Sequence, residues 1–179
     1  MRLERVALAI LLCAAAFAAT ARDLPSAVLA DAPGLDLHGS AEMRRFGFRI
    51  YTARLWTGAA GYRPGEPFAL DIEYAVNLKG KDLAEVSIDE MRDLGQRDDA
   101  LLERWRVAMA AAFPNVKKGD RLVGLALPGQ EARFYSNERH LATIRDPAFV
   151  DAFFSIWLDR GTSAPEVRAG LLGTTQRQP

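Results

Sequence analysis

The sequence has very few of the side chains that bind metals tightly or form disulfides. Its 179 residues contain one cysteine, Cys13, and two histidines, His38 and His140. A single thiol cannot form an intramolecular disulfide, and zinc modules or iron–sulfur centres built on cysteines need several. No group of Cys and His residues has the spacing of a metal site. The sequence therefore predicts no bound metal and no other cofactor.

An excess of charge of either sign is also missing. The chain has 23 Lys and Arg residues against 23 Asp and Glu, so its formal net charge is zero. Proteins that bind nucleic acid normally carry a basic excess that displaces counterions, and nucleic acid is therefore not an expected partner. Hydrophobic residues make up 49% of the chain, enough for a real core. The length fits one domain.

The first 21 residues have the three parts of a secretory signal peptide. Arg2 and Arg5 precede an uninterrupted apolar run over residues 6–19, and Ala19-Thr20-Ala21 forms a small-x-small cleavage site. This run is short for a membrane span, which needs about 20 apolar residues, although an N-terminal anchor helix is the alternative. Cleavage after Ala21 would leave a mature chain without a thiol and without a membrane span. We therefore predict a periplasmic protein.

The hydrophobic pattern of the remaining chain predicts an α+β fold. Apolar residues alternate with polar ones in the predicted strands and recur every three or four residues in the predicted helices. Strands are predicted over residues 44–56, 68–75, 120–127 and 132–136, and helices over 82–94, 98–113, 147–158 and 163–172. This order favours helices packed on a mostly antiparallel sheet. Residues 22–33 are predicted to be a flexible lead-in and residues 174–179 a frayed tail.

Helix ends carry recognisable capping signals. Asp98 and Asp99 at the start of the second predicted helix suit its positive N-terminal end, and Asp146 followed by Pro147 is a candidate cap of the third. Ser163 and Glu166 have the spacing of a capping box at the start of the fourth. The third helix also carries Phe149, Phe153, Phe154 and Trp157. This aromatic set either packs the helix on the sheet or lines a ligand pocket, and packing is the commoner use.

The strand predicted over 44–56 carries a candidate anion site. One face, with Phe46, Phe48 and Ile50, is expected to point into the core. The other face carries Arg45, Arg49 and Tyr51. A guanidinium can bind a carboxylate through two parallel hydrogen bonds, and a phenol can add another donor. The alternative is that the arginines simply face water. No serine lies in a nucleophile elbow and no phosphate-binding loop is present, so no catalytic residue is assigned.

Several segments resemble conserved blocks of the bacterial chalcone isomerase-like proteins. They occur in the family's order and cover about residues 34–173, which we take as the domain. The blocks are GSA (39–41), FGFRIYTARLW (46–56), FPNVKKGDRL (113–122), LPG (127–129), FYSN (134–137), DPAF (146–149), FFSIWL (153–158) and RAGLLG (168–173). The resemblance implies an open-faced sandwich, with a large antiparallel β-sheet, a helical layer and a cleft between them.

The resemblance implies that the residues for chalcone isomerase catalysis are replaced. The plant enzymes that cyclise chalcones use an Arg that steers the substrate, a Thr on the first strand, and a Tyr and an Asn on the first helix. In this sequence the Thr position falls at Tyr51, and the two helix positions fall near Leu83 and Glu90. An alkyl side chain can neither donate a proton nor order a water molecule. We therefore expect no chalcone isomerase activity.

Another branch of the family binds fatty acids, and it holds the carboxylate with an Arg and a Tyr. Tyr51 matches that Tyr, but the common position of the Arg is occupied by Met43. Arg44 and Arg45 follow directly. Strand parity favours Arg45 as the neighbour of Tyr51, whereas a β-bulge would favour Arg44.

The sequence as a whole therefore predicts a non-catalytic periplasmic protein that binds a fatty acid or a similar small amphipathic carboxylate. Two alternatives remain open. One is an isomerase or lyase for an unknown small molecule, in which Tyr51 and an arginine stabilise developing charge. The other is an envelope protein whose cleft is filled by side chains and whose surface binds a partner protein. The oligomeric state is not predicted.

Overall fold

A computed structural model describes residues 23–174 of the chain and shows six strands and five helices. The strands form one antiparallel sheet in the order β1-β2-β3-β4-β5-β6. This confirms the predicted α+β fold with an open antiparallel sheet. The predicted signal peptide and residues 175–179 of the predicted tail lie outside the described residues. The strands are β1 (Asp36–Arg45), β2 (Phe48–Thr57), β3 (Phe68–Tyr74), β4 (Arg121–Leu127), β5 (Glu131–Ser136) and β6 (Arg139–Ile144).

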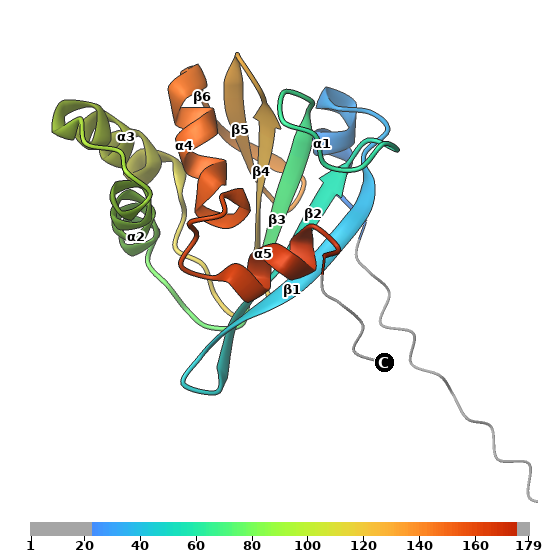
Figure 1. Ribbon diagram of the computed structural model, residues 1–179, viewed down its shortest axis with the longest axis horizontal. Helices are drawn as coiled ribbons and strands as arrows, with labels where there is room; N and C mark the ends of the chain where they lie inside the picture. Colours follow the sequence, from blue (N-terminus) through green and yellow to red (C-terminus); the bar gives the residue numbers. More distant parts are fainter. Residues whose placement is uncertain (1–22, 175–179) are drawn as a thin grey trace, which may run out of the picture.

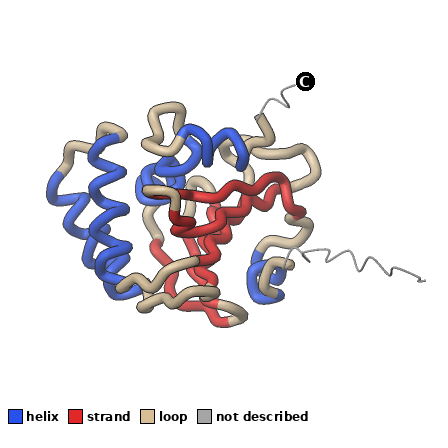
Figure 2. Tube along the Cα trace, turned by 90° about the horizontal axis from the view of Figure 1, so that it is seen from below, coloured by secondary structure: helices blue, strands red, loops and turns tan. Residues whose placement is uncertain are grey.

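Helices cover both faces of the sheet unequally (Figures 1 and 2). We call the face under α2, α3, α4 and α5 the front face and the face under α1 the back face. The large front-face core contains β-strand residues such as Leu55 and Leu70 together with aromatic side chains of α4. A smaller back-face core surrounds Val28 of α1. The helices are α1 (Ser26–Asp31), α2 (Gly80–Asp93), α3 (Asp99–Ala112), α4 (Pro147–Leu158) and α5 (Pro165–Leu171).

The single strand predicted over 44–56 is wrong, because a tight turn interrupts it. Phe46 and Gly47 have φ angles of 51° and 81°, and this two-residue turn joins β1 to β2. Two central residues with positive φ are typical of the type I′ turns that match the twist of a hairpin. Phe46 and Phe48 are therefore 88% and 74% exposed, not buried as the alternation suggested.

Most of β1 was not predicted, because its sequence has no regular apolar alternation. The strand is held at the edge of the sheet by α5, through two glycines. A Cβ on Gly39 would clash with the carbonyl oxygen of Leu171, and a Cβ on Gly170 would lie 2.9 Å from the carbonyl oxygen of Ser40. The close approach of the two backbones explains how a helix packs on a polar strand.

The flexible lead-in predicted for residues 22–33 is also wrong for its described part. Residues 26–31 form α1, and Leu24 and Val28 are buried in the back-face core. The Asp31 carboxylate accepts a hydrogen bond from the Tyr135 hydroxyl and pairs with Arg133 at 3.0 Å. Contacts with strands more than 100 residues away thus order this segment. No local sequence pattern predicts these contacts.

The predicted helix cap at Asp146 is confirmed, and Asp98 also caps its helix. Asp98 accepts a hydrogen bond from the backbone N–H of Leu101, and Asp146 accepts from the N–H groups of Ala148 and Phe149. The predicted capping box at Ser163 is wrong, since α5 has Ala164 at its N-cap position without a side-chain hydrogen bond. The aromatic rings of α4 pack mainly against one another and the sheet, as in the contact of Phe153 with Phe134.

Candidate functional site: a cavity between sheet and helices

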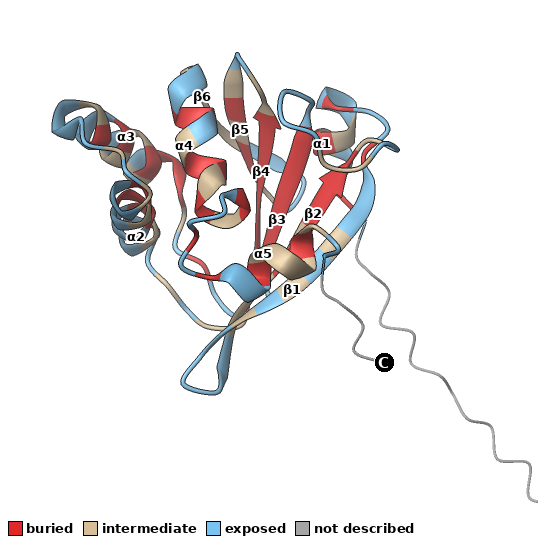
Figure 3. Cartoon of the chain, viewed as in Figure 1, coloured by how far each residue is buried: buried red, intermediate tan, exposed pale blue. Residues whose placement is uncertain are grey.

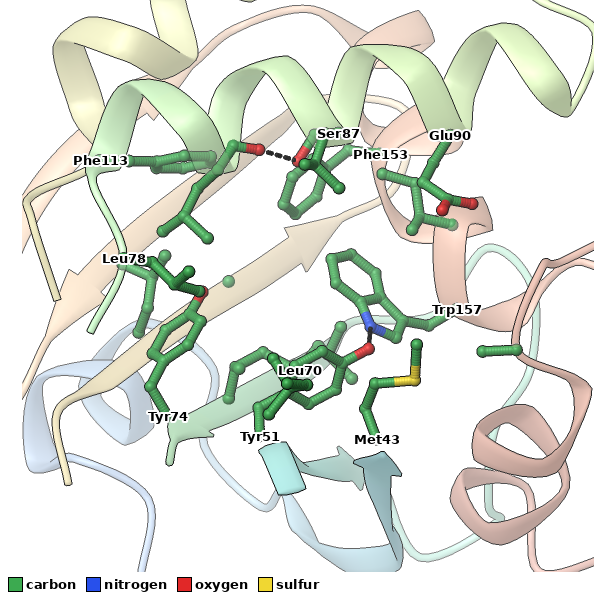
Figure 4. Close-up of a pocket in the computed structure, with 18 of the residues that line it drawn as sticks. Met43, Tyr51, Leu70, Tyr74, Leu78, Ser87, Glu90, Phe113, Phe153 and Trp157 are labelled. Carbon is green, nitrogen blue, oxygen red and sulfur yellow. Dashed lines mark hydrogen bonds between the residues drawn. The ribbon is translucent and has the colours of Figure 1, made fainter. Parts of the chain in front are cut away.

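A cavity of about 390 Å³ lies between the front face of the sheet and the helices (Figure 4). Pockets that hold small molecules typically measure about 300–1,000 Å³ and are mostly apolar. Strands β1 to β5 supply the floor, α2 one wall, and α4 with the following loop another. Most of the lining side chains are apolar, among them Ile50, Leu70, Ile72, Val76, Leu78, Leu83, Phe113, Leu122, Phe134, Phe153, Phe154 and Ile156.

Three neighbouring strands place one row of side chains on the floor of this cavity. Met43 of β1 pairs with Tyr51 of β2, and Tyr51 pairs with Tyr74 of β3. Directly opposed residues on adjacent strands project from the same face of a sheet. All three side chains line the cavity. The sheet register therefore sets two phenols next to each other under an apolar roof.

The Tyr51 hydroxyl is oriented by Trp157 of α4. The indole Nε1–H donates to the Tyr51 oxygen over 3.0 Å (Figure 4). Burial raises the pKa of Tyr51 to about 12, and Glu90 and Glu166 add to the shift. The phenol is therefore neutral at physiological pH. With its oxygen already accepting from Trp157, its own O–H can donate into the cavity.

Tyr74 carries a second phenol that sequence reasoning missed. The side chain is 6% exposed, lines the cavity, and makes no hydrogen bond to any described residue through its hydroxyl. Burial raises the pKa of Tyr74, so this group is also a neutral donor. In the described part of the chain, the fully buried side-chain atoms without a partner belong to Arg54 and Trp56, so the Tyr74 hydroxyl keeps some access and can donate into the cavity. The only sequence signal is a phenol at the end of an apolar alternation that otherwise contains Phe68, Leu70 and Ile72.

The two candidate arginines lie in different surroundings. Arg45 lines the rim of the cavity, and its guanidinium carbon lies 5.5 Å from the centre of the Phe46 ring. Arg44 is not among the lining residues and binds Glu42 at 2.7 Å. The two arginines are consecutive in β1, and successive strand residues project to opposite faces of the sheet.

Arg45 and Tyr51 thus reach one cavity from two paired strands. Strand parity assumed a single strand and does not explain this arrangement. In the hairpin Arg45 pairs with Phe48, and Tyr51 pairs with Met43. The structure brings Arg45 and Tyr51 to the same cavity and leaves Arg44 on the outer surface.

Helix α2 presents carboxylates and alkyl groups to the same cavity. Asp82, Leu83 and Glu90 all line it, and Glu90 accepts a hydrogen bond from the Ser163 hydroxyl at 2.8 Å. Leu83 and Glu90 are the positions at which the family resemblance places the Tyr and Asn of the plant enzymes. Ser87 also lines the wall, but its hydroxyl donates to the carbonyl oxygen of Leu83. Unlike the phenols of the floor, this wall offers no free hydroxyl donor.

The described residues contain neither a grouped metal-ligand set nor a helix suited to span a membrane. Within residues 23–174, no three His, Cys, Asp or Glu side chains are grouped so that they could hold a metal ion. No helix in that range is both long and apolar enough to cross a bilayer.

Comparisons with known proteins agree with this architecture. The family model described as chalcone isomerase-like matches residues 17–173. An uncharacterized protein of Haemophilus influenzae is 31% identical over 139 residues, which is 77% of this chain and 68% of that protein. The crystal structure of a fatty-acid binding protein of Arabidopsis thaliana matches with a TM-score of 0.61 at 9% identity, over 79% of this chain and 88% of that one. This chain is thus a member of the chalcone isomerase-like family.

Proposed function

We propose that this protein is a non-catalytic binding protein that holds a fatty acid or a similar small amphipathic carboxylate in the cavity between sheet and helices. The observation that carries the proposal is the pair of phenols on the cavity floor, the half-buried Tyr51 and the buried Tyr74, whose O–H groups have no acceptor among the described residues. A ligand oxygen would supply the missing acceptor. The fatty-acid binding protein of Arabidopsis thaliana shares the fold, which supports this choice of ligand class.

The apolar wall suits the tail of such a ligand. Leu70, Phe113 and Phe153 are buried side chains that face the cavity from the sheet, the segment after α3, and α4. Transfer of apolar surface from water into such surroundings contributes roughly 25 cal/mol per Å². A hydrocarbon chain would therefore bind through area rather than through specific contacts, and its length would be limited by the volume of about 390 Å³.

The charges around the cavity favour one position for the head group. Arg45 is the cationic side chain of the lining, on the sheet side, whereas Asp82 and Glu90 lie on α2. A carboxylate is attracted by the first and repelled by the others. It would therefore sit over the floor, with Tyr51 and Tyr74 as donors and Arg45 at the rim. We propose Arg45 and Tyr51, together with Tyr74, as the binding residues, and we exclude Arg44 because it is paired with Glu42.

Two features support binding over the alternatives. The cavity is empty of side chains over a volume sufficient for a small molecule, which disfavours a partner-binding module with a filled cleft. Leu83 brings an alkyl group to the wall, and the Ser87 hydroxyl donates a hydrogen bond to a backbone carbonyl. Neither supplies a proton donor on this wall, where the family resemblance places the helix Tyr of the plant isomerases, and this disfavours their reaction. With the predicted signal peptide, we propose that the binding takes place in the periplasm.

Titration with saturated fatty acids of increasing chain length tests the proposal. Trp157 lines the cavity, so its fluorescence should change on binding, with one ligand per protein and an optimum chain length. Ser87→Leu should fill part of the cavity and abolish or strongly weaken binding. Ser155→Leu is the matched control, because Ser155 also bonds a carbonyl of its own helix but does not line this cavity. Absence of uptake at every chain length would refute the proposal.

A further inference from the structure

The tip of the β1–β2 hairpin projects from the body of the protein and carries exposed aromatic rings (Figures 1 and 3). Phe46 is 88% exposed and Phe48 is 74% exposed, the two highest values among the large hydrophobic residues of the described chain. Arg44, Arg45 and Arg49 flank them. Single exposed apolar residues need no explanation, but two phenylalanines at a projecting tip are an unusual use of large apolar side chains.

All four lysines of the chain lie in two loops at the same end of the molecule. Lys79 and Lys81 lie at the start of α2, Lys117 and Lys118 lie before β4, and all four are exposed. Backbone hydrogen bonds between Leu78 and Val116 hold the two loops side by side.

Further backbone hydrogen bonds join these loops to the hairpin. The N–H of Ala75 donates to the carbonyl oxygen of Ile50 at 2.8 Å, and that of Gly119 donates to Tyr74 at 2.7 Å. We call residues 42–50, 75–82 and 114–120 the basic end. It contains seven Lys and Arg residues and three Asp and Glu residues, although the whole chain is neutral. The fold therefore gathers a net positive charge at the basic end.

Part of the cavity's lining belongs to this same end. Arg45 and Asp82, which are exposed at its rim, belong to the basic end, as do the lining residues Ile50, Val76 and Leu78. A molecule that enters between the hairpin and α2 therefore passes directly from the basic end to the two phenols of the floor.

We propose that the basic end docks on the surface of a lipid bilayer that contains anionic lipids, with Phe46 and Phe48 inserted among the headgroups. Aromatic side chains bind favourably in the interface of a bilayer, and nearby Lys and Arg residues are attracted to anionic headgroups. A docked molecule holds the mouth of its cavity against the membrane, so that an amphipathic ligand can move between bilayer and cavity. The docking stands by itself, whereas this transfer rests on the proposed function.

A bilayer explains the geometry better than an acidic partner protein does. The two rings extend from a two-residue turn, and a protein partner would need a pocket shaped to receive them. A fluid interface accepts protruding rings without such a pocket. Positive side chains flank the rings on the hairpin and also lie on the loops joined to it at Ile50, which suits a broad negative surface.

Sedimentation with vesicles tests the docking on the full folded domain. Binding is expected to vesicles of phosphatidylcholine with 30% phosphatidylglycerol, to be weak to phosphatidylcholine alone, and to fall with added salt. The double variant Phe46→Ser, Phe48→Ser should reduce binding by about tenfold or more. The matched control, Leu37→Ser with Val107→Ser, removes two other exposed apolar side chains and should leave binding unchanged. Equal binding by both double variants would overturn the proposal, as would no binding by the unchanged protein.

Variants of the lysines test the docking independently of the phenylalanines. Lys117→Gln with Lys118→Gln should weaken binding to the anionic vesicles by roughly 10- to 30-fold, at about 1 kcal/mol per charge. Arg63→Gln with Arg104→Gln removes the same charge from exposed positions outside the basic end and should have a much smaller effect. Equal losses would overturn the docking geometry. Because none of these side chains lines the cavity, fatty-acid titration of the same variants reports separately on the proposed function.

Discussion

The two faces of the sheet treat buried polar groups in opposite ways. On the back face, Arg121 donates two hydrogen bonds to the fully buried Asp71 carboxylate, at 3.0 and 2.6 Å, and the Tyr135 hydroxyl donates to Asp31 of α1. On the front face, the hydroxyls of Tyr51 and Tyr74 point into an unfilled cavity. Polar groups that bind one another hold the fold together. Those that face empty space are available to a molecule from outside.

Two other buried polar atoms also lack a hydrogen-bond partner, but they differ from the front-face phenols. Arg54 Nη1 and Trp56 Nε1 are buried without a hydrogen-bond partner. Neither residue lines the cavity. Arg54 is in any case engaged by its other nitrogen, which donates to Glu73 at 3.0 Å. Tyr51 and Tyr74 differ from these two groups because they line a space that a ligand can occupy.

The largest expected effect comes from the back face. Asp71→Ala would leave the Arg121 guanidinium buried without its counter-ion, and removing one partner of a buried pair typically reduces stability by about 3–5 kcal/mol. Urea unfolding measures this loss. Since Asp71 does not line the cavity, fatty-acid affinity of the folded variant should be unchanged. A loss below about 1 kcal/mol would show that this pair does not stabilise the fold as we describe.

A matched pair of tyrosines compares the faces directly. Tyr135→Phe removes the donor that Asp31 uses and should lower the free energy of unfolding by about 1–3 kcal/mol, with fatty-acid binding retained. Tyr74→Phe removes a hydroxyl without a partner, so its stability should equal or exceed that of the unchanged protein. Its fatty-acid affinity should fall about five- to tenfold. If Tyr74→Phe is destabilising and binds ligand normally, Tyr74 is structural.

Alkaline pH should destabilise the protein partly through the front face. Burial raises the pKa of Tyr51 to about 12 from a usual value of 10, so the folded state keeps a proton that the unfolded chain loses. Stability must therefore fall as pH rises from about 10 towards 12. At pH 11 the raised pKa of Tyr51 lowers the free energy of unfolding by about 1 kcal/mol. The variant Tyr51→Phe should show a correspondingly shallower decline in urea unfolding between pH 9 and 11, and an identical slope would contradict the burial of this phenol.

The smallest expected effect separates the two arginines. Arg45→Gln should weaken fatty-acid binding by up to about fivefold, because exposed charges contribute roughly 0.2–1 kcal/mol. Arg44→Gln should leave affinity unchanged, since Arg44 pairs with Glu42 outside the cavity. Isothermal titration of both variants at low salt resolves the difference. A larger effect of Arg44→Gln would reassign the head-group position.

Local patterns in the sequence predicted the parts of the fold that local interactions determine. The cap at Asp146 binds backbone groups within three residues, and it was predicted. Alternation located β3, whose apolar side chains meet a buried core on the front face. The hairpin was missed because Phe46 occupies a positive φ that phenylalanine rarely adopts.

The remaining features depend on contacts between distant segments. Helix α1 is ordered by Tyr135 and Glu138, more than 100 residues away. Sequence reasoning selected Arg45 and Tyr51 as site residues, but it could not find Tyr74. Its role depends on the register between β2 and β3 and on the separation of the sheet from α2, neither of which is encoded in a short stretch of residues.

Native mass spectrometry of the protein recovered from cells addresses the occupied state of the cavity most directly. Our account predicts a population heavier by the mass of one long-chain carboxylate, which is absent from Ser87→Leu and present in Ser155→Leu. A bare mass for the unchanged protein, together with no adduct after incubation with fatty acids, would contradict it.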